Sequence, residues 1–329
     1  MPLNRKVALV AFDRQVSGKG TLAATPLYGL GLRGGNVFDP QMEQTYEELT
    51  IADRFPPSAY RTAFHPKMSF TSRAWPRSLG LLLFAALGAD APTGAGDPWT
   101  HVITPGATPL YLTGFGRLDT EYHKIRDCRI DELGLTLDKA EPLEISCSLL
   151  GTVASPYLGT PWAATNDDSD QQSFFPAGGV FQLDTDSVTP VTADITGGEI
   201  MISNHLMPID LSRSLAPDDN WPGLHEITVT LRLIPTDTTL ARSVWTGADA
   251  GTTLSNTPVY GSFSTKFTIS GSRDLTLAAT RMAWTPTSYP DADPAGGPAE
   301  LEMTATVLKP AGAAFTATLL NQVASYPGS

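Results

Sequence analysis

Apolar and polar residues alternate strictly along two neighbouring stretches, 133–137 and 143–149, which are separated by a turn-like polar segment. A period of two on both sides of a short polar break is typical of an antiparallel hairpin with one buried face. We therefore predict a hairpin. The side chains expected on its inward face are Leu133, Leu135, Leu137, Leu143, Ile145 and Leu149.

Similar alternation recurs in the C-terminal half, and it predicts strands along most of the chain. The further predicted strands lie near 65–74, 108–113, 179–184, 198–203, 226–234, 263–270, 274–283, 299–308 and 314–320. Residues 1–40 are rich in Gly and Pro, and we predict them to be irregular. The fold class that follows is all-β with long loops.

One segment has the pattern of a helix. The run Leu79–Leu87 is almost continuously apolar, Ser78 precedes it as a candidate N-cap, and Gly88 follows it as a candidate C-terminal stop. We predict a single short, buried helix over 78–88.

Breaks in the pattern divide the chain into three parts. Residues 41–62 are acidic and end near two prolines, as expected of an exposed loop or arm, and 151–176 is a candidate linker. We therefore expect an N-terminal arm over 1–62, one β domain over 63–160 and a second over 161–329. The charged residues singled out in the arm are Glu43, Glu47, Glu48, Asp53 and Arg54.

The charge of the chain is low and unevenly placed. Charged residues make up 17% of the 329 residues, and the formal net charge is −12. Residues 1–165 hold 15 basic and 16 acidic side chains, whereas 166–329 hold 7 and 18. No basic stripe is present, so tight binding to nucleic-acid phosphate is not expected, and an acidic surface would instead repel a polyanion.

The termini and cysteines indicate a protein made in a reducing cytoplasm. We expect no signal peptide, because only a short apolar run follows the N-terminal Arg5-Lys6, and the longest apolar segment is about half of the roughly 20 residues that a membrane-spanning helix needs. Two cysteines, Cys128 and Cys147, do not make a disulfide framework for a chain of this size.

Candidate chemistry is sparse, and we predict neither a catalytic site, a cofactor nor a metal. The glycine-rich segment 29–34 matches a dinucleotide-binding spelling, but no helical pattern follows it. The five histidines are scattered without metal-ligand spacing. Asp167, Asp168 and Asp170 lack the glycine and glutamate of a calcium loop, so a solvated acidic loop is favoured.

The order of these features resembles that of the tail tube (major tail) proteins of long-tailed bacteriophages (siphophages), in their two-part variety. The features concerned are the Gly/Pro-rich N-terminal segment, acidic Glu47-Glu48, the strand around Lys67–Ala74, the helix ending in Leu87-Gly88, and the hairpin from Ile130 to Ser146. The resemblance covers the layout of about residues 20–320 and involves no signature motif.

The resemblance implies a structural virion protein rather than an enzyme. Such proteins fold as β-sandwiches or half-barrels flanked by a helix, close into homo-oligomeric rings and stack into a hollow tube for genome ejection. Two tube-like sandwiches would favour three chains in a pseudo-sixfold ring over six. The arm would contact adjacent rings, the hairpin would belong to the inner sheet, and Asp167, Asp168 and Asp170 become candidate lumen or loop acids through which DNA passes without adhering.

Further partners implied by the resemblance are a tape-measure protein, a tail terminator and baseplate proteins. The expected location is the virion tail, after synthesis in the host bacterial cytoplasm and without a membrane. Two alternatives stay open from the residues: another virion β protein, such as a decoration or baseplate component, and a carbohydrate-binding or carbohydrate-cleaving β protein. The latter would need clustered aromatic side chains and two carboxylates across a groove.

Overall fold

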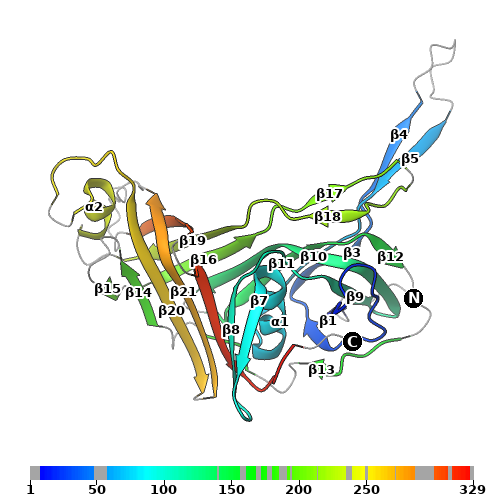
Figure 1. The fold of residues 1–329 in the computed structure, drawn as a ribbon, viewed down its shortest axis with the longest axis horizontal. Helices are drawn as coiled ribbons and strands as arrows, with labels where there is room; N and C mark the ends of the chain where they lie inside the picture. The colour runs from blue at the N-terminus through cyan, green and yellow to red at the C-terminus, as the bar shows by residue number, and fades with distance from the viewer. Residues whose placement is uncertain are drawn as a thin grey trace, which may run out of the picture.

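The computed structural model describes most of the chain and is built almost entirely from antiparallel strands (Figure 1). The described residues are 8–47, 58–138, 141–155, 161–167, 172–175, 180–184, 191–192, 195–212, 214–234, 239–248, 251–270, 272–285, 300–309 and 313–326. The all-β class predicted from the alternation is confirmed.

The N-terminal half contains a closed barrel. Its strands are β1 (Ala8–Arg14), β2 (Tyr28–Gly31), β3 (Gly34–Asp39), β6 (Lys67–Arg73), β9 (Leu112–Leu118), β10 (Glu121–Asp138) and β11 (Glu144–Leu150). Hydrogen bonding runs in the order β2, β1, β9, β10, β11, β6, β3. Because β2 and β3 are separated by only two residues, they act as one bent strand that closes the ring.

Strand β10 joins the two sheets of the molecule. Its first part pairs with β9 and with β12 (Val153–Ser155), whereas its second part pairs with β11 and β16 (Ile195–Ser203). The change of partner falls where the register shifts between Ile125 and Cys128, with Asp127 at a φ of 55°. Such irregularities bend a strand and re-aim it, which lets one long strand serve both sheets.

The second half continues the sheet and then divides it. The strands that follow β16 are β19 (Glu226–Leu233), β22 (Leu301–Val307) and β21 (Arg273–Thr285). One edge of β21 is shared: its C-terminal end pairs with β22, and its N-terminal part pairs with β23 (Phe315–Asn321). The branch through β23 continues to β8 (Trp99–Pro105) and β7 (Gly88–Thr93).

On its other edge β21 pairs with β20 (Val259–Ser270), and β14 (Val180–Asp184) and β15 (Val191–Thr192) extend the sheet from there.

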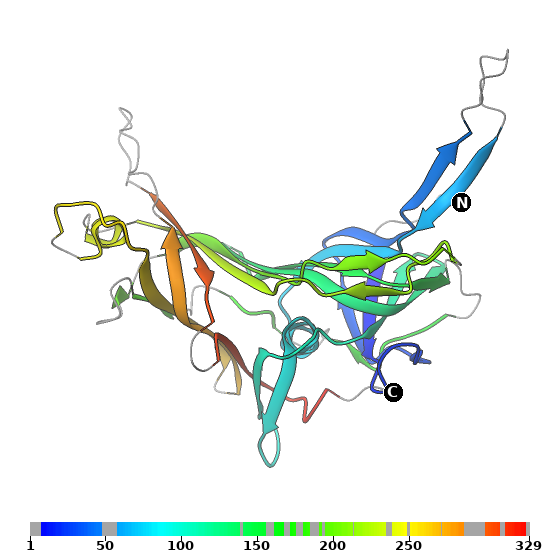
Figure 2. The same cartoon turned by 45° about the horizontal axis from the view of Figure 1, so that its top comes forward.

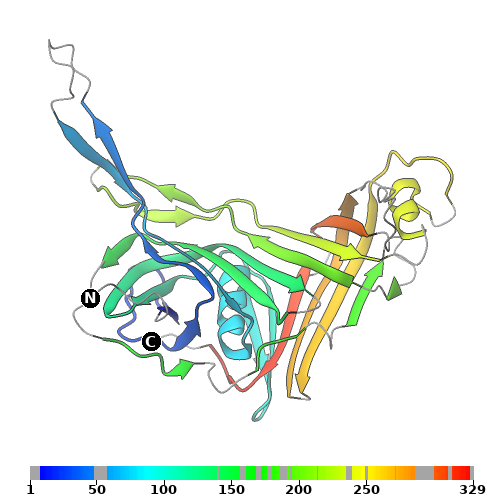
Figure 3. The ribbon, with the colours of Figure 1, turned by 180° about the vertical axis from the view of Figure 1, so that it is seen from behind.

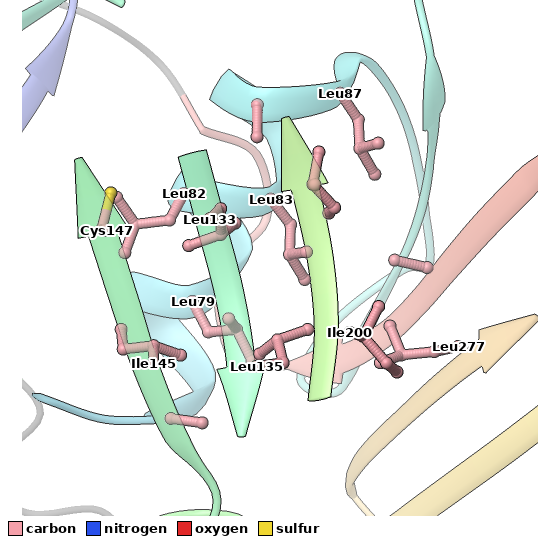
Figure 4. Packing of buried hydrophobic residues seen from close by; sticks show 14 of the residues in the cluster. Leu79, Leu82, Leu83, Leu87, Leu133, Leu135, Ile145, Cys147, Ile200 and Leu277 are labelled. Carbon is pink, nitrogen blue, oxygen red and sulfur yellow. The ribbon is translucent and has the colours of Figure 1, made fainter. Parts of the chain in front are cut away.

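Helix α1 (Pro76–Leu87) fills the space between the two branches. It contacts β10 on one side and β8 and β23 on the other, and every residue except Arg77 is buried. Figure 4 shows its Leu79, Leu82 and Leu83 packed against the inward side chains of the predicted hairpin. Burying apolar surface from a helix between two sheet layers stabilises all three elements together.

The predicted end of this helix is right and its start is two residues late. Gly88 adopts the left-handed conformation at the C-cap, with a φ of 99°. The N-cap is Trp75 rather than Ser78, because Pro76 is preorganised for the first helical position and needs no amide hydrogen there.

Two sequence-based expectations are wrong in the described part of the chain. Residues 8–39 are not irregular throughout, since β1 to β3 belong to the barrel, although the segment 15–27 between β1 and β2 contains no helix or strand. Also, α1 is not the only helix: α2 (Thr239–Thr246) follows β19 and buries Ala241 and Val244. Its eight residues are too few for the helical period to stand out in the sequence.

The domain division at residues 62/63 and 160/161 stays a prediction. Two described features bear on it: β1 to β3 pair with one another and with strands from 63–160, and β10 pairs with β16 across the expected linker. Part of that linker packs on the barrel, where β13 (Asn166–Asp167) lies parallel to β2 and Trp162 contacts Phe115.

Candidate assembly surfaces

A two-stranded arm projects from one end of the molecule (Figures 2 and 3). It consists of β4 (Met42–Tyr46) and β5 (Ala59–Phe64), which pair only with each other. All of β4 and the first four residues of β5 are exposed. An isolated two-stranded ribbon is marginally stable in water, so this shape is typical of an element that completes its packing on another molecule.

Few of the predicted arm residues lie in the described part. Glu43 is exposed on β4, and Glu47 follows that strand, where its carboxylate accepts hydrogen bonds from the Ser58 hydroxyl and, at 3.2 Å, from the Tyr60 hydroxyl. Glu48, Asp53 and Arg54 lie outside the described residues. The Glu47 contacts hold the two chain segments together beyond the last strand pair.

The strands β6, β11, β10, β16, β19 and β22 form one long sheet. A second ribbon, formed by β17 (Met207–Ile209) and β18 (Asp219–Trp221), links the arm to this long sheet. It continues the β16–β19 pair, and its loop reaches the base of the arm. There the Phe64 amide donates to the Leu215 carbonyl at 2.8 Å, and His65 pairs with Asp210 at 3.0 Å. Both ribbons therefore lie at the same end of the molecule (Figure 1).

The predicted hairpin is present and is formed by β10 and β11. Leu133 lies opposite Cys147 and Leu135 opposite Ile145. Each of the six inward side chains is at most 2% exposed. These residues therefore form the core of the long sheet, and their place in an inner sheet of a tube stays a prediction.

The opposite face of the long sheet is polar and rich in hydroxyl groups. One row of register partners crosses it from β6 to β22 and consists of Arg73, Glu144, Thr136, Glu199, Thr230 and Thr304. Thr230 and Thr304 hydroxyls are 3.2 Å apart, and Arg33 pairs with Glu144. Glu132 is exposed on the same face of β10. We call this surface the hydroxyl face; it lies opposite α1.

The acidic residues predicted from the sequence cannot be placed there. Asp168 and Asp170 lie outside the described residues, and for Asp167 only the backbone is described, in β13.

Sequence reasoning missed a buried ion pair. His101 on β8 is fully buried, with its Nδ1 2.8 Å from Asp90 and its Nε2 donating to the Val323 carbonyl at 2.7 Å. Burial opposes the charged imidazole, but the contacts with Asp90 and Val323 outweigh it and raise the pKa of His101. The pair fixes the C-terminal segment to the sheet. Nothing in the spacing of 11 residues between Asp90 and His101 signals it.

A carbohydrate-cleaving or metal-dependent protein would need carboxylates across a groove or grouped metal ligands. The described residues contain no group of three or more His, Cys, Asp or Glu placed to hold a metal ion. Three surface grooves of about 310–390 Å³ carry at most one carboxylate each, that of Glu132. Within the described parts, no helix has both the length and the apolar character to cross a membrane.

An all-β fold with an unpacked arm, a second exposed ribbon and a broad polar face defines a protein that works through surfaces. A family model described as "Phage tail tube protein" matches residues 7–319. The chain belongs to this family, which confirms the resemblance drawn from the sequence. No curated protein sequence matches the chain.

Membership makes the protein a structural component of the virion tail that assembles into a tube with other tail proteins. A structural family points away from catalysis, and the absence of enzymatic activity in this chain stays a prediction.

Proposed function

We propose that this protein self-assembles into rings that stack into the tail tube, a hollow conduit for DNA ejection. The observation that carries the proposal is the arm β4–β5, whose residues are largely exposed and which, among the described strands, pairs only with itself. In a stack, a neighbouring ring supplies the missing contact. Head-to-tail contacts between identical chains produce closed rings or open tubes, depending on the rotation between copies.

A ring of three chains is our preferred arrangement over six. It follows if each half of the chain contributes one tube-like sandwich, and the long sheet that continues through β10 and β16 supports this by keeping the halves in one rigid unit. The tape-measure protein, the tail terminator and the baseplate are the partners proposed at the ends and inside of the tube.

The hydroxyl face is the surface we propose for the conduit. Its row consists of Thr, Glu and one Arg side chain, and two cations at this face are paired, Arg73 with Glu141 and Arg33 with Glu144. The face therefore offers phosphate no concentrated positive charge, and Glu132 and Glu199 repel it. The opposite face of the same sheet is covered by α1 and is unavailable. The acidic residues of 166–329 add to the same repulsion.

Electron microscopy of the concentrated protein tests the proposal. Hollow tubes with a regular axial repeat are expected, and end-on views distinguish three chains from six. Deleting residues 43–57 should leave a folded protein that no longer stacks, because the described part of this segment is exposed and β4 pairs with no described strand other than β5. Circular dichroism checks the fold of the deletion variant. Normal tubes from that variant would refute the role of the arm, and wild-type protein that never polymerises would refute the tube itself.

A further inference from the structure

The exposed apolar side chains of the described residues gather at one end of the molecule. Fourteen large apolar side chains of the described residues are exposed in total. Eight of them lie on the arm or on the β17–β18 ribbon and its flanks: Met42, Tyr46, Tyr60, Met207, Ile209, Leu215, Trp221 and Leu224. The other six are scattered over distant elements. Contiguous apolar surface of this kind marks an interaction site rather than chance exposure.

The ribbon presents its apolar side chains together. Met207 lies directly opposite Trp221 in the strand register, so their side chains are neighbours, and Ile209 follows two residues later on the same face. Met207 is 57% exposed and Trp221 is 59% exposed. Leu224 extends the patch beyond β18. We call Met207, Ile209, Trp221 and Leu224 the ribbon patch.

The ribbon patch is held rigidly from the side of the barrel. Arg129, which is buried, donates to the Asn220 carbonyl at 2.6 Å and lies 4.0 Å above the ring of Tyr111. The Tyr111 hydroxyl in turn donates to Asp219 at 2.6 Å. A surface that is already ordered loses less conformational entropy when a partner binds.

The carboxylates around the ribbon patch have hydrogen-bonding or ionic partners within the chain. Its four carboxylates, Asp210, Asp218, Asp219 and Glu226, contact His65, Lys19, Tyr111 and His205 respectively. Burying the patch under a partner therefore leaves none of these four carboxylates buried without a partner, which would be costly. A partner with an apolar, aromatic surface fits it better than a charged one.

The arm carries exposed apolar side chains on both faces, with Met42 and Tyr46 on one face and Tyr60 on the other in the strand register. Met42, Tyr46 and Tyr60 are each more than half exposed, and the arm points away from its own body in every view (Figures 1–3). Its apolar side chains therefore need a second molecule. Aromatic side chains, Trp among them, and Met are enriched at the cores of protein interfaces. The ribbon patch offers both types in Met207 and Trp221.

We propose that the ribbon patch is the docking site for the arm of a second copy of this chain, with Trp221 as its central contact. The inference rests on the proposed function and adds the receiving surface to it. The contact is heterologous, because arm and patch are different surfaces, so it can propagate through a tube.

Cysteine cross-linking between copies tests the contact directly. The two native cysteines are both buried, and burial raises the pKa of each thiol, that of Cys128 to about 12. Introduced surface cysteines are therefore far more reactive. Tyr60→Cys protein is mixed with Met207→Cys protein, assembled, oxidised and analysed on a non-reducing gel. Leu254→Cys, at a 73% exposed position outside the two apolar surfaces, replaces Met207→Cys in the control.

The expected result is a disulfide between positions 60 and 207 in the assembled fraction, identified by mass spectrometry, and none with position 254. Trp221→Arg should raise the concentration needed for assembly about tenfold or more, whereas Leu254→Arg should not. Both sites are exposed, so both variants should fold.

Two outcomes overturn the inference in distinguishable ways. Tubes without the 60–207 disulfide, together with normal assembly of Trp221→Arg, remove the docking site and leave the proposed tube intact. Wild-type protein that forms no tubes removes the proposed function and the docking site with it.

Discussion

Gly80 on α1 is a position where a very small substitution should have a large effect. A Cβ at this position would lie 1.7 Å from the Tyr326 hydroxyl oxygen and 2.4 Å from its Cζ. Contacts under 3.0 Å do not occur, so Gly80→Ala must displace the ring. Tyr326 is only 2% exposed and packs against His101 with ring centroids 4.7 Å apart.

The magnitude follows from what the ring loses. Removing a large aromatic side chain from a core costs about 3–5 kcal/mol. Loss of the Asn321–Tyr326 hydrogen bond adds about 1 kcal/mol. Alanine is favoured over glycine inside a helix by about 1 kcal/mol, which partly offsets both. Gly80→Ala should therefore lower the free energy of unfolding by about 3–5 kcal/mol.

Urea denaturation followed by circular dichroism measures this loss, and a double-mutant cycle identifies its cause. In a Tyr326→Ala background the clash with the ring is gone, and only Leu319 Cδ2, at 2.8 Å, still lies within 3.0 Å of the new Cβ. Gly80→Ala should therefore destabilise the protein far less there than in wild type. Gly31→Ala, where a Cβ meets no atom within 4 Å, is the matched control in wild type. Equal destabilisation by Gly80→Ala in both backgrounds would refute the reasoning.

Two further predictions concern charge. The folded-state pKa of His101 is raised, so its ion pair contributes fully to stability below the ordinary pKa of about 6.5 and loses that contribution as the pH rises through the raised value. In urea titrations, the difference in stability between wild type and His101→Gln should therefore shrink from pH 5.5 to pH 9. A difference that grows over this range would contradict the prediction. On the hydroxyl face, Glu132→Lys combined with Glu199→Lys should make purified tubes retain double-stranded DNA in cosedimentation, with release at high salt. Glu121→Lys, on the first part of β10 where it pairs with β9, is the control, and no retention by the double variant would exclude this face as the conduit lining.

The strands with one buried face could be predicted from the sequence because their neighbours leave the other face polar. From Leu133 to Leu149 the period of two follows directly from the alternation of side chains across the sheet. Gly88 likewise marked the end of α1, since it adopts a positive φ that other residues disfavour. These features depend on local geometry alone.

Strand β1 was not predicted from the sequence, because the residues that surround it come from distant parts of the chain. It runs through an apolar stretch in which Val10, Ala11 and Phe12 are buried in succession. A strand that is covered on both faces does not alternate between apolar and polar residues, so the period of two that predicts a strand is missing.

The assembly surfaces depend on the tertiary structure in the same way. The sequence indicated an exposed arm from its acidic and proline residues, but it did not separate Trp221, which is 59% exposed, from Trp284, which is 3% exposed. Both lie in or at the end of strands, and their exposure depends on which distant elements cover them. Apolar character is a property of a residue, whereas burial is a property of its neighbours, and most of those neighbours are far away along the chain.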